Sequence, residues 1–276
     1  MTGESKIWFI TGISRGFGRE LAEALLARGD TVIGTTRNGP AEVPQGKGHL
    51  DVIALDVTDG EAVRKAVTEA FKLHGRIDVI VNNAGYGLLS SVEEATDGEI
   101  EHVFAVNFHG TRRVIQAALP QLRAQRSGHI VNITSMAGVA PNPGSGYYAA
   151  AKMAVEGLSQ SLAREVGPLG IRVTLVEPSA FRTDFLSEHS IRRSAAGVKD
   201  YAGTAGAARD NLAAMAGKQP GDPARAAAAI IRAVDSPNPP LHLVLGADAY
   251  RRTRQMLDAF SADLEAWRAV SIGADY

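Results

Sequence analysis

Two residues that together could transfer a proton, Tyr148 and Lys152, stand four positions apart in the chain. On a helix this spacing puts both side chains on one face. A free tyrosine has a pKa of about 10, and a nearby ammonium group lowers that pKa by favouring the phenolate. The pair therefore predicts a tyrosine that exchanges a proton with a substrate. Tyr147 is the alternative, but the residue four positions after it is Ala151, which carries no charge.

A Tyr-Lys pair alone is a common coincidence, but further polar residues stand where a catalytic site would place them. Ser135 follows a predicted strand at 129–133, thirteen residues before Tyr148. The run NNAG at 82–85 follows another predicted strand, and Asn107 lies in the helix beyond it. In sheets of this kind, ligands bind at the carboxyl ends of the strands. The alternatives are a helix-kinking or core role for Asn107 and a structural turn at 82–85, which is compatible with binding.

A glycine-rich segment, TGISRGFG at 11–18, directly follows the first predicted strand and leads into a helix. Glycine lets the chain turn tightly and lets the backbone approach a pyrophosphate at the positive end of a helix dipole. Many such segments are plain turns, but the strand-to-helix context favours dinucleotide binding. The residues of this segment expected at the cofactor are Gly12, Ser14, Arg15, Gly16, Phe17 and Gly18.

The end of the second predicted strand indicates which dinucleotide is bound. Sites for NAD usually carry an acid there, which holds the ribose hydroxyls. This chain has Thr36 followed by Arg37 and Asn38, while Asp30 lies at the opposite end of the strand. Arginine forms charge-assisted hydrogen bonds with a 2′-phosphate, and Arg15 can flank the same phosphate. We therefore predict NADP(H); the alternative is that both arginines are solvated surface charges.

Short apolar runs alternate with helix-period segments along the chain, and most of the runs are continuous. Continuous apolar runs are typical of strands buried on both faces, as in a parallel sheet. Amphipathic segments at 17–28 and 59–74 predict helices between the strands. Since no repeat or linker divides the chain, we predict one α/β domain over residues 1–276. Its fold is a single doubly wound parallel sheet of Rossmann type, with helices on both faces. The predicted strands lie at 7–10, 31–35, 51–55, 77–81, 129–133, 173–176 and 241–245.

The segment 180–220 breaks this alternation, because it is polar, rich in alanine and punctuated by glycine, with no clear strand. A segment of this length inside a compact domain is usually a lid or a functional loop. We therefore expect a substrate lid there, part of it helical, and an amphipathic helical tail at 249–270. The expected substrate pocket is apolar and offers no anchor for a charged group, which favours a hydrophobic substrate. Its residues are Met136, Val139, Pro141, Phe181, Phe185 and Leu186.

Composition excludes several other classes of protein. The formal net charge is −1, which gives no basic surface for nucleic acid. Basic clusters at 192–193 and 251–254 are interpreted as solvated charges. Because the chain lacks cysteine and its seven histidines form no closely spaced pair, we expect no metal site, although ligands distant in sequence stay open. No apolar run approaches the roughly 20 residues of a membrane span, and a cytoplasmic protein is expected.

In their order and spacing, these motifs resemble the short-chain dehydrogenase/reductase family over almost the whole chain, weakening after Thr183. The resemblance implies an NADP-dependent enzyme acting on a small-molecule ketone, aldehyde or alcohol. Tyr148 resembles the general acid of reduction and the base of oxidation. Lys152 resembles the residue that holds the nicotinamide ribose and tunes that tyrosine. Ser135 resembles the donor to the substrate oxygen, and Asn107 the holder of a water in a proton relay.

The resemblance also implies cofactor and subunit contacts. Ser179 replaces the glycine that usually follows Pro178, a departure at the lid entrance that leaves the proton-transfer residues intact. Helices like those that carry Asn107 and Tyr148 form subunit contacts across much of the family, so a homodimer or homotetramer is expected. The implied cofactor contacts are Asp56 and Val57 at the adenine, Asn83, Ala84 and Gly85 along the ribose, Thr183 at the nicotinamide carboxamide, and Pro178 beside it.

Two other functions remain as alternatives. A cofactor-binding regulator that senses redox state without turnover would be expected to lack the tyrosine or the lysine, and this chain keeps both. An epimerase or dehydratase that uses bound NAD is disfavoured by Arg37 and by the spacing of the glycine segment.

Overall fold

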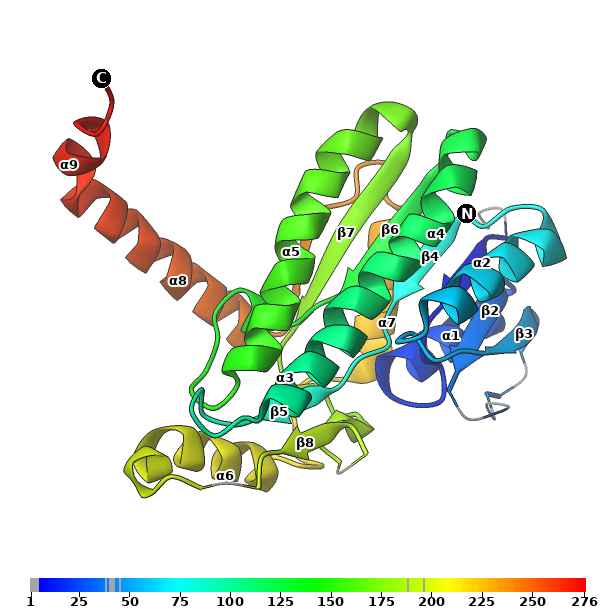
Figure 1. Ribbon diagram of the computed structural model, residues 1–276. Helices are drawn as coiled ribbons and strands as arrows, with labels where there is room; N and C mark the ends of the chain where they lie inside the picture. The colour runs from blue at the N-terminus through cyan, green and yellow to red at the C-terminus, as the bar shows by residue number, and fades with distance from the viewer. Residues whose placement is uncertain (1–4, 38, 40–42, 45, 188, 196) are drawn as a thin grey trace.

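The computed structural model describes residues 5–37, 39, 43–44, 46–187, 189–195 and 197–276. Within this part of the chain, seven parallel strands form one sheet in the order β3-β2-β1-β4-β6-β7-β9 (Figure 1). The predicted doubly wound α/β fold is confirmed, and each predicted strand is present with its ends shifted by at most a few residues. The strands are β1 (Ile7–Ile10), β2 (Thr31–Thr36), β3 (His49–Ala54), β4 (Val79–Asn82), β6 (Gly128–Ile133), β7 (Ile171–Pro178) and β9 (His242–Leu245).

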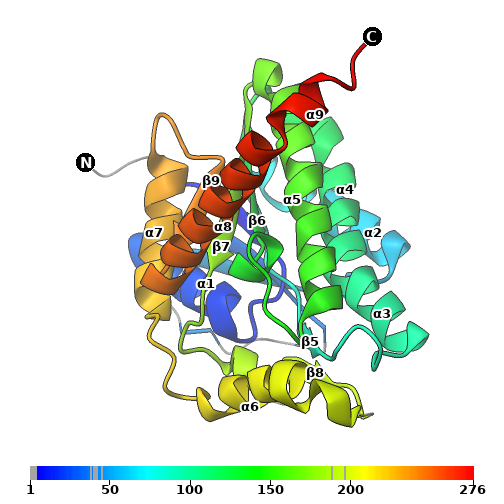
Figure 2. The same ribbon diagram turned by 90° about the vertical axis from the view of Figure 1, so that its left-hand side faces the viewer.

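Helices cover both faces of the sheet, as Figure 2 shows with the sheet lying between them. Helices α1 (Gly16–Arg28) and α7 (Pro223–Asp235) pack on one face, where Trp8 and Ile10 of β1 are buried. Helices α2 (Gly60–His74), α4 (Thr111–Gln125) and α5 (Gly146–Val166) pack on the other, against Phe9. Successive residues of β1 thus enter opposite cores, which explains why the run is continuously apolar.

Several shorter elements connect these layers. Helix α3 (Asp97–Phe104) begins with a capping box between Thr96 and Glu99 and continues through a π-helical turn at Ala105–Gly110 into α4. Among the described residues, no helix is both long and apolar enough to cross a membrane. Further short turns of helix lie at Met136–Gly138, Gly167–Leu169, Asp184–Leu186, Lys199–Tyr201 and Ala202–Gly206.

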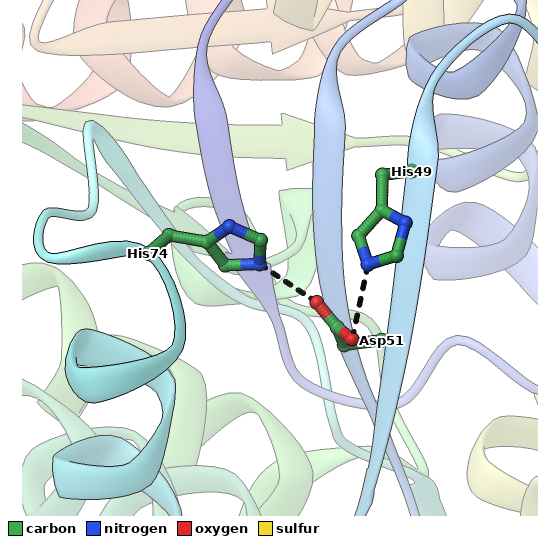
Figure 3. A group of neighbouring side chains, drawn as sticks. All are labelled: His49, Asp51 and His74. Atoms are coloured by element: carbon green, nitrogen blue, oxygen red, sulfur yellow. Dashed lines mark hydrogen bonds and ion pairs between the residues drawn. The ribbon is translucent and has the colours of Figure 1, made fainter.

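The edge strand β3 is joined to the end of α2 by a carboxylate between two imidazoles (Figure 3). His49 Nε2 lies 3.1 Å from one oxygen of Asp51, and His74 Nε2 lies 2.7 Å from the other. The two histidines are far apart in sequence, so their spacing did not reveal this proximity. Each carboxylate oxygen is engaged by one imidazole, so the group links the strand and the helix through hydrogen bonds.

The expectation that segment 180–220 has no strand is wrong. Strand β8 (Ile191–Arg193) pairs in parallel with β5 (Gly87–Leu89), and helix α6 (Ala207–Ala214) follows it. Three residues are too few to give an apolar pattern, and two of these three are arginines. The predicted tail is present as α8 (Ala247–Ala266) and α9 (Arg268–Ile272), which project away from the sheet (Figure 1).

Candidate active site

A cavity of about 510 Å³ opens at the carboxyl edge of the sheet. Most of the predicted site residues line it, so the fold gathers segments that are far apart in sequence. Gly18 and Asn107 are not part of the lining, and Asn38 lies outside the described residues. The predicted residues that line the cavity are Gly12, Ser14, Arg15, Gly16, Phe17, Arg37, Asp56, Val57, Asn83, Ala84, Gly85, Ser135, Tyr148, Lys152, Pro178 and Thr183.

The glycine-rich turn at one end of the cavity is held in place by Asn83. Its side-chain amide donates to the carbonyl oxygens of Thr11 and Gly12, at 2.9 and 2.7 Å. At Gly18 a Cβ atom would lie 2.2 Å from the Gly12 carbonyl oxygen, so only glycine allows α1 to pack this closely on the turn. Gly18 therefore contributes to the site by allowing the helix to pack closely on the turn, since Gly18 itself does not line the cavity.

The first turn of α1 can accept an anion. Arg15 stands at the N-cap and makes no capping bond with its side chain, and the first turn contains no acid. The backbone N–H groups of Gly16 and Phe17, whose residues both line the cavity, have no partner within the helix because of their position. At Gly16, whose φ is +60°, an added Cβ atom would lie 4.0 Å from the Thr183 Cβ. These features fit a pyrophosphate at a helix N-terminus.

Three arginines and one acid line the same cavity. Arg37 is exposed at the end of β2, whereas Arg15 donates to the His189 carbonyl oxygen at 3.1 Å. The acid is Asp56, whose pKa is lowered because hydrogen bonds from Thr58 and the charge of Arg37 outweigh its burial. The cavity is therefore positive overall, which suits an anionic ligand.

At the other end of the cavity, Tyr148 and Lys152 are both buried on α5. The Lys152 ammonium group donates to the Ile133 carbonyl oxygen at 2.8 Å and lies 5.9 Å from the centre of the Tyr148 ring. Burial raises the pKa of Tyr148 to about 12, against a smaller lowering by a bond to Ser135, and burial lowers the pKa of Lys152 to about 8. The expected lowering of the tyrosine pKa by the ammonium group is therefore wrong: burial dominates, and Tyr148 keeps its proton at neutral pH.

Asn107 sits in the π-helical turn between α3 and α4 and is buried. Its side chain bonds both backbone groups of Tyr86, donating to the carbonyl oxygen at 2.8 Å and accepting from the N–H at 3.0 Å. It thereby fixes the chain that leaves β4 beside the cavity. Asn107 is thus a buried core residue at a distortion of the helix, which agrees with both alternatives considered from the sequence. Its role in a water relay stays a prediction.

The substrate end differs from the apolar pocket expected from the sequence. Phe181, Phe185 and Leu186 line the cavity, whereas Met136, Val139 and Pro141 do not. Arg192, interpreted from the sequence as a solvated charge, lines it as well, with its guanidinium 5.2 Å from the centre of the Tyr86 ring. Arg192 interacts with His102, which in turn lies near Asp56 and Arg37, so the expectation that the substrate pocket offers no charged anchor stays a prediction. Pairing of β8 with β5 brings Arg192 here, and His102 and His189 also line the cavity without a prior signal.

A second group of titratable residues lies one helical turn beyond Lys152. Glu156 of α5 and Glu177 of β7 are buried, and His242 Nδ1 lies 2.6 Å from Glu177 and 3.9 Å from Glu156. Burial, together with the charge of Glu177, raises the pKa of Glu156 to about 8. Nothing in the sequence singled out any of these three residues, because they lie on α5, β7 and β9 and meet only in the fold.

Three comparisons place these observations among known proteins. A family model described as short chain dehydrogenase matches residues 6–193. The chain is 38% identical over 275 residues to oxidoreductase BOA17 of Botryotinia fuckeliana, covering 98% of this chain and 99% of that protein. It is 39% identical over 199 residues to a 3-ketodihydrosphingosine reductase of Bacteroides thetaiotaomicron, covering 72% of each chain. The crystal structure of a short-chain dehydrogenase from Streptomyces avermitilis superposes with a TM-score of 0.90 at 41% identity, covering 99% of this chain and 100% of that one.

The raised pKa of Glu156 predicts a pH dependence of folding stability. The folded state keeps this proton between pH 4.5 and about 8, where the unfolded chain releases it, so stability falls as pH rises through this range. The lowered pKa of Lys152 adds an opposite slope only above about 8. Glu156→Gln should flatten the decline measured by urea unfolding, and Glu165→Gln, an exposed change on the same helix, should not. Equal slopes in the wild type and Glu156→Gln would contradict the assignment.

Proposed function

The chain belongs to the short-chain dehydrogenase family, and on that premise we propose that it transfers a hydride between NADPH and the carbonyl or alcohol carbon of a small, largely hydrophobic substrate. One observation carries the proposal. The cavity that holds Ser135, Tyr148 and Lys152 at one end holds the glycine turn and Arg37 at the other. A proton donor and a dinucleotide site thus share one space.

Each end of the cavity has a role in this proposal. The first turn of α1 binds the pyrophosphate, Arg37 binds the 2′-phosphate, and Lys152 lies where it can hold the nicotinamide ribose. Ser135 and Tyr148 both orient the substrate oxygen, and Tyr148 donates its proton to that oxygen as negative charge develops there. Burial raises the pKa of Tyr148 to about 12, so at neutral pH the phenol holds the proton that reduction of a carbonyl group consumes.

Tyr148→Phe removes the proposed proton donor and should lower kcat by about 10²- to 10⁴-fold, the usual contribution of a general acid. NADPH binding, measured by fluorescence titration, should be nearly unchanged. Tyr147→Phe is the matched control, because the Tyr147 hydroxyl donates to the Val92 carbonyl oxygen at 3.0 Å and does not line the cavity. Equal activity of the two variants, with any carbonyl substrate that the wild type reduces, would remove the assignment.

Arg37→Ala should weaken catalysis with NADPH far more than with NADH. A charge-assisted hydrogen bond contributes about 1.5–3 kcal/mol, and each 1.4 kcal/mol is tenfold, so kcat/KM for NADPH should fall roughly ten- to a hundredfold. Thr36→Asp combined with Arg37→Ala should reverse the preference, because the carboxylate would bond the ribose and repel the phosphate. Arg164→Ala, at an exposed site outside the cavity, is the control. A wild-type NADPH-to-NADH ratio near one would refute the cofactor choice.

We also propose that segment 180–220 closes over the bound substrate as a lid. Its residues Phe181, Phe185 and Leu186 line the cavity, and Arg15 of the glycine turn bonds the His189 backbone within it. Trypsin should cut first in this segment, which contains Lys199 and Arg209. NADPH together with a carbonyl compound that the enzyme reduces should slow that cleavage several-fold. The same cleavage rate with and without these ligands would leave the segment without a lid function.

A further inference from the structure

Helix α8 leaves the molecule as a projecting arm, here defined as residues 247–272 (Figure 1). Only its beginning is packed: Ala249 is buried, and the Arg252 side chain donates to the Ala140 carbonyl oxygen. From Leu257 onward every residue is exposed. In proteins most of the stability of a helix comes from packing of its amphipathic face, and from Leu257 onward the arm lacks such packing within the described chain. The arm therefore needs a partner.

The arm carries an apolar seam with the spacing of a coiled coil. Its six residues follow one another at intervals of three and four, which keeps them on one face of a helix. Five of them are large apolar or aromatic side chains exposed by 46–65%, and the sixth is a threonine. The seam residues are Tyr250, Thr253, Leu257, Phe260, Leu264 and Trp267.

We propose that this seam pairs with the same seam of a second copy of the chain, the two arms running antiparallel about a two-fold axis. The seam is matched to itself in this orientation, with the axis between Leu257 and Phe260. Tyr250 of one copy then faces Trp267 of the other, and Leu257 faces Phe260. A two-fold contact of this kind closes on itself and ends assembly at a defined number of copies.

The charges of α8 favour the antiparallel direction. Its first half contains three arginines and one aspartate, whereas its second half contains two aspartates and one glutamate and no basic residue. The three arginines also pair within the helix, Arg251 and Arg252 with Asp248 and Arg254 with Asp258. Antiparallel pairing places the basic half of each arm beside the acidic half of the other, and parallel pairing would place like charges side by side.

The size of the seam fits a specific dimer contact. Aromatic side chains bury about 150–250 Å² each, so the exposed parts of Tyr250, Phe260 and Trp267 offer roughly 300–500 Å² per copy. The leucines and the exposed Val270 and Ile272 add to this. Stable interfaces bury about 800 Å² per partner. The polar face of the arm is not rich in basic residues, so a membrane surface fits it less well.

This surface is separate from helices α4 and α5, which the family resemblance names as subunit contacts. An arm contact added to a contact through those helices would convert a dimer into a tetramer. The proposal does not depend on the oxidoreductase function, since it rests on the arm alone.

The first test is the mass of the full chain in solution by sedimentation or light scattering. The wild type should contain an even number of copies, and Leu257→Glu with Phe260→Glu should halve it, because charges would enter the seam. The control is Ala259→Glu with Ala262→Glu, the same charges on exposed positions outside the seam, which should leave the mass unchanged. Circular dichroism checks that both variants keep their helices. A monomeric wild type, or a seam variant of unchanged mass, would overturn the proposal. A monomeric chain that binds zwitterionic lipid vesicles in a flotation assay would also overturn it.

The second test fixes the direction of pairing, and the absence of cysteine from the chain makes it specific. Tyr250→Cys and Trp267→Cys proteins should each resist oxidation to a disulfide-linked dimer when alone. Mixed and oxidised, they should cross-link to each other. Efficient cross-linking of each protein with itself, and not with the other, would contradict the antiparallel arrangement.

Discussion

The buried Lys152 ammonium group determines the arrangement of the catalytic end of the molecule. It donates to the carbonyl oxygen of Ile133, the last residue of β6. This bond fixes the position of α5 along its axis relative to the end of β6. Ser135 leaves the same strand two residues later, and Tyr148 stands one helical turn before the lysine. A charge in this position is stable only with a partner, because burial disfavours it. The contact that satisfies the ammonium group thus also helps to set the distance between Ser135 and Tyr148, the two groups proposed to bind the substrate oxygen.

Burial has opposite effects on the two members of this pair. It raises the pKa of Tyr148 to about 12 and lowers that of Lys152 to about 8, so two groups with nearly equal pKa values in water move apart. The pattern Tyr-x-x-x-Lys indicated that the two residues share a face, but it carries no information on dielectric surroundings. Burial of the Tyr148 hydroxyl itself raises its pKa and keeps the phenol protonated.

The sequence predicted what local pattern encodes. Strands β1, β2, β4 and β6 were evident from apolar runs, and the glycine turn from its place after the first strand. Prediction from the sequence failed where segments that are far apart in the chain meet in the fold. Arg192 reaches the cavity only through the pairing of two three-residue strands, and Glu177 and His242 approach Glu156 from separate strands. Asn107 was found, but its bonds to Tyr86 depend on a π-helical turn that no residue pattern announced.

The order of strands in the sheet has a consequence for how the chain assembles during synthesis. Strand β1 occupies an inner position, and each later strand of the sheet adds beside one already made: β2 and β4 beside β1, β3 beside β2, β6 beside β4, β7 beside β6, and β9 beside β7. In this seven-stranded sheet, every strand after β1 finds a partner that precedes it in the chain. Synthesis from the N-terminus therefore supplies the strands in an order that lets the sheet grow outward from β1, with a partner already made for each new strand.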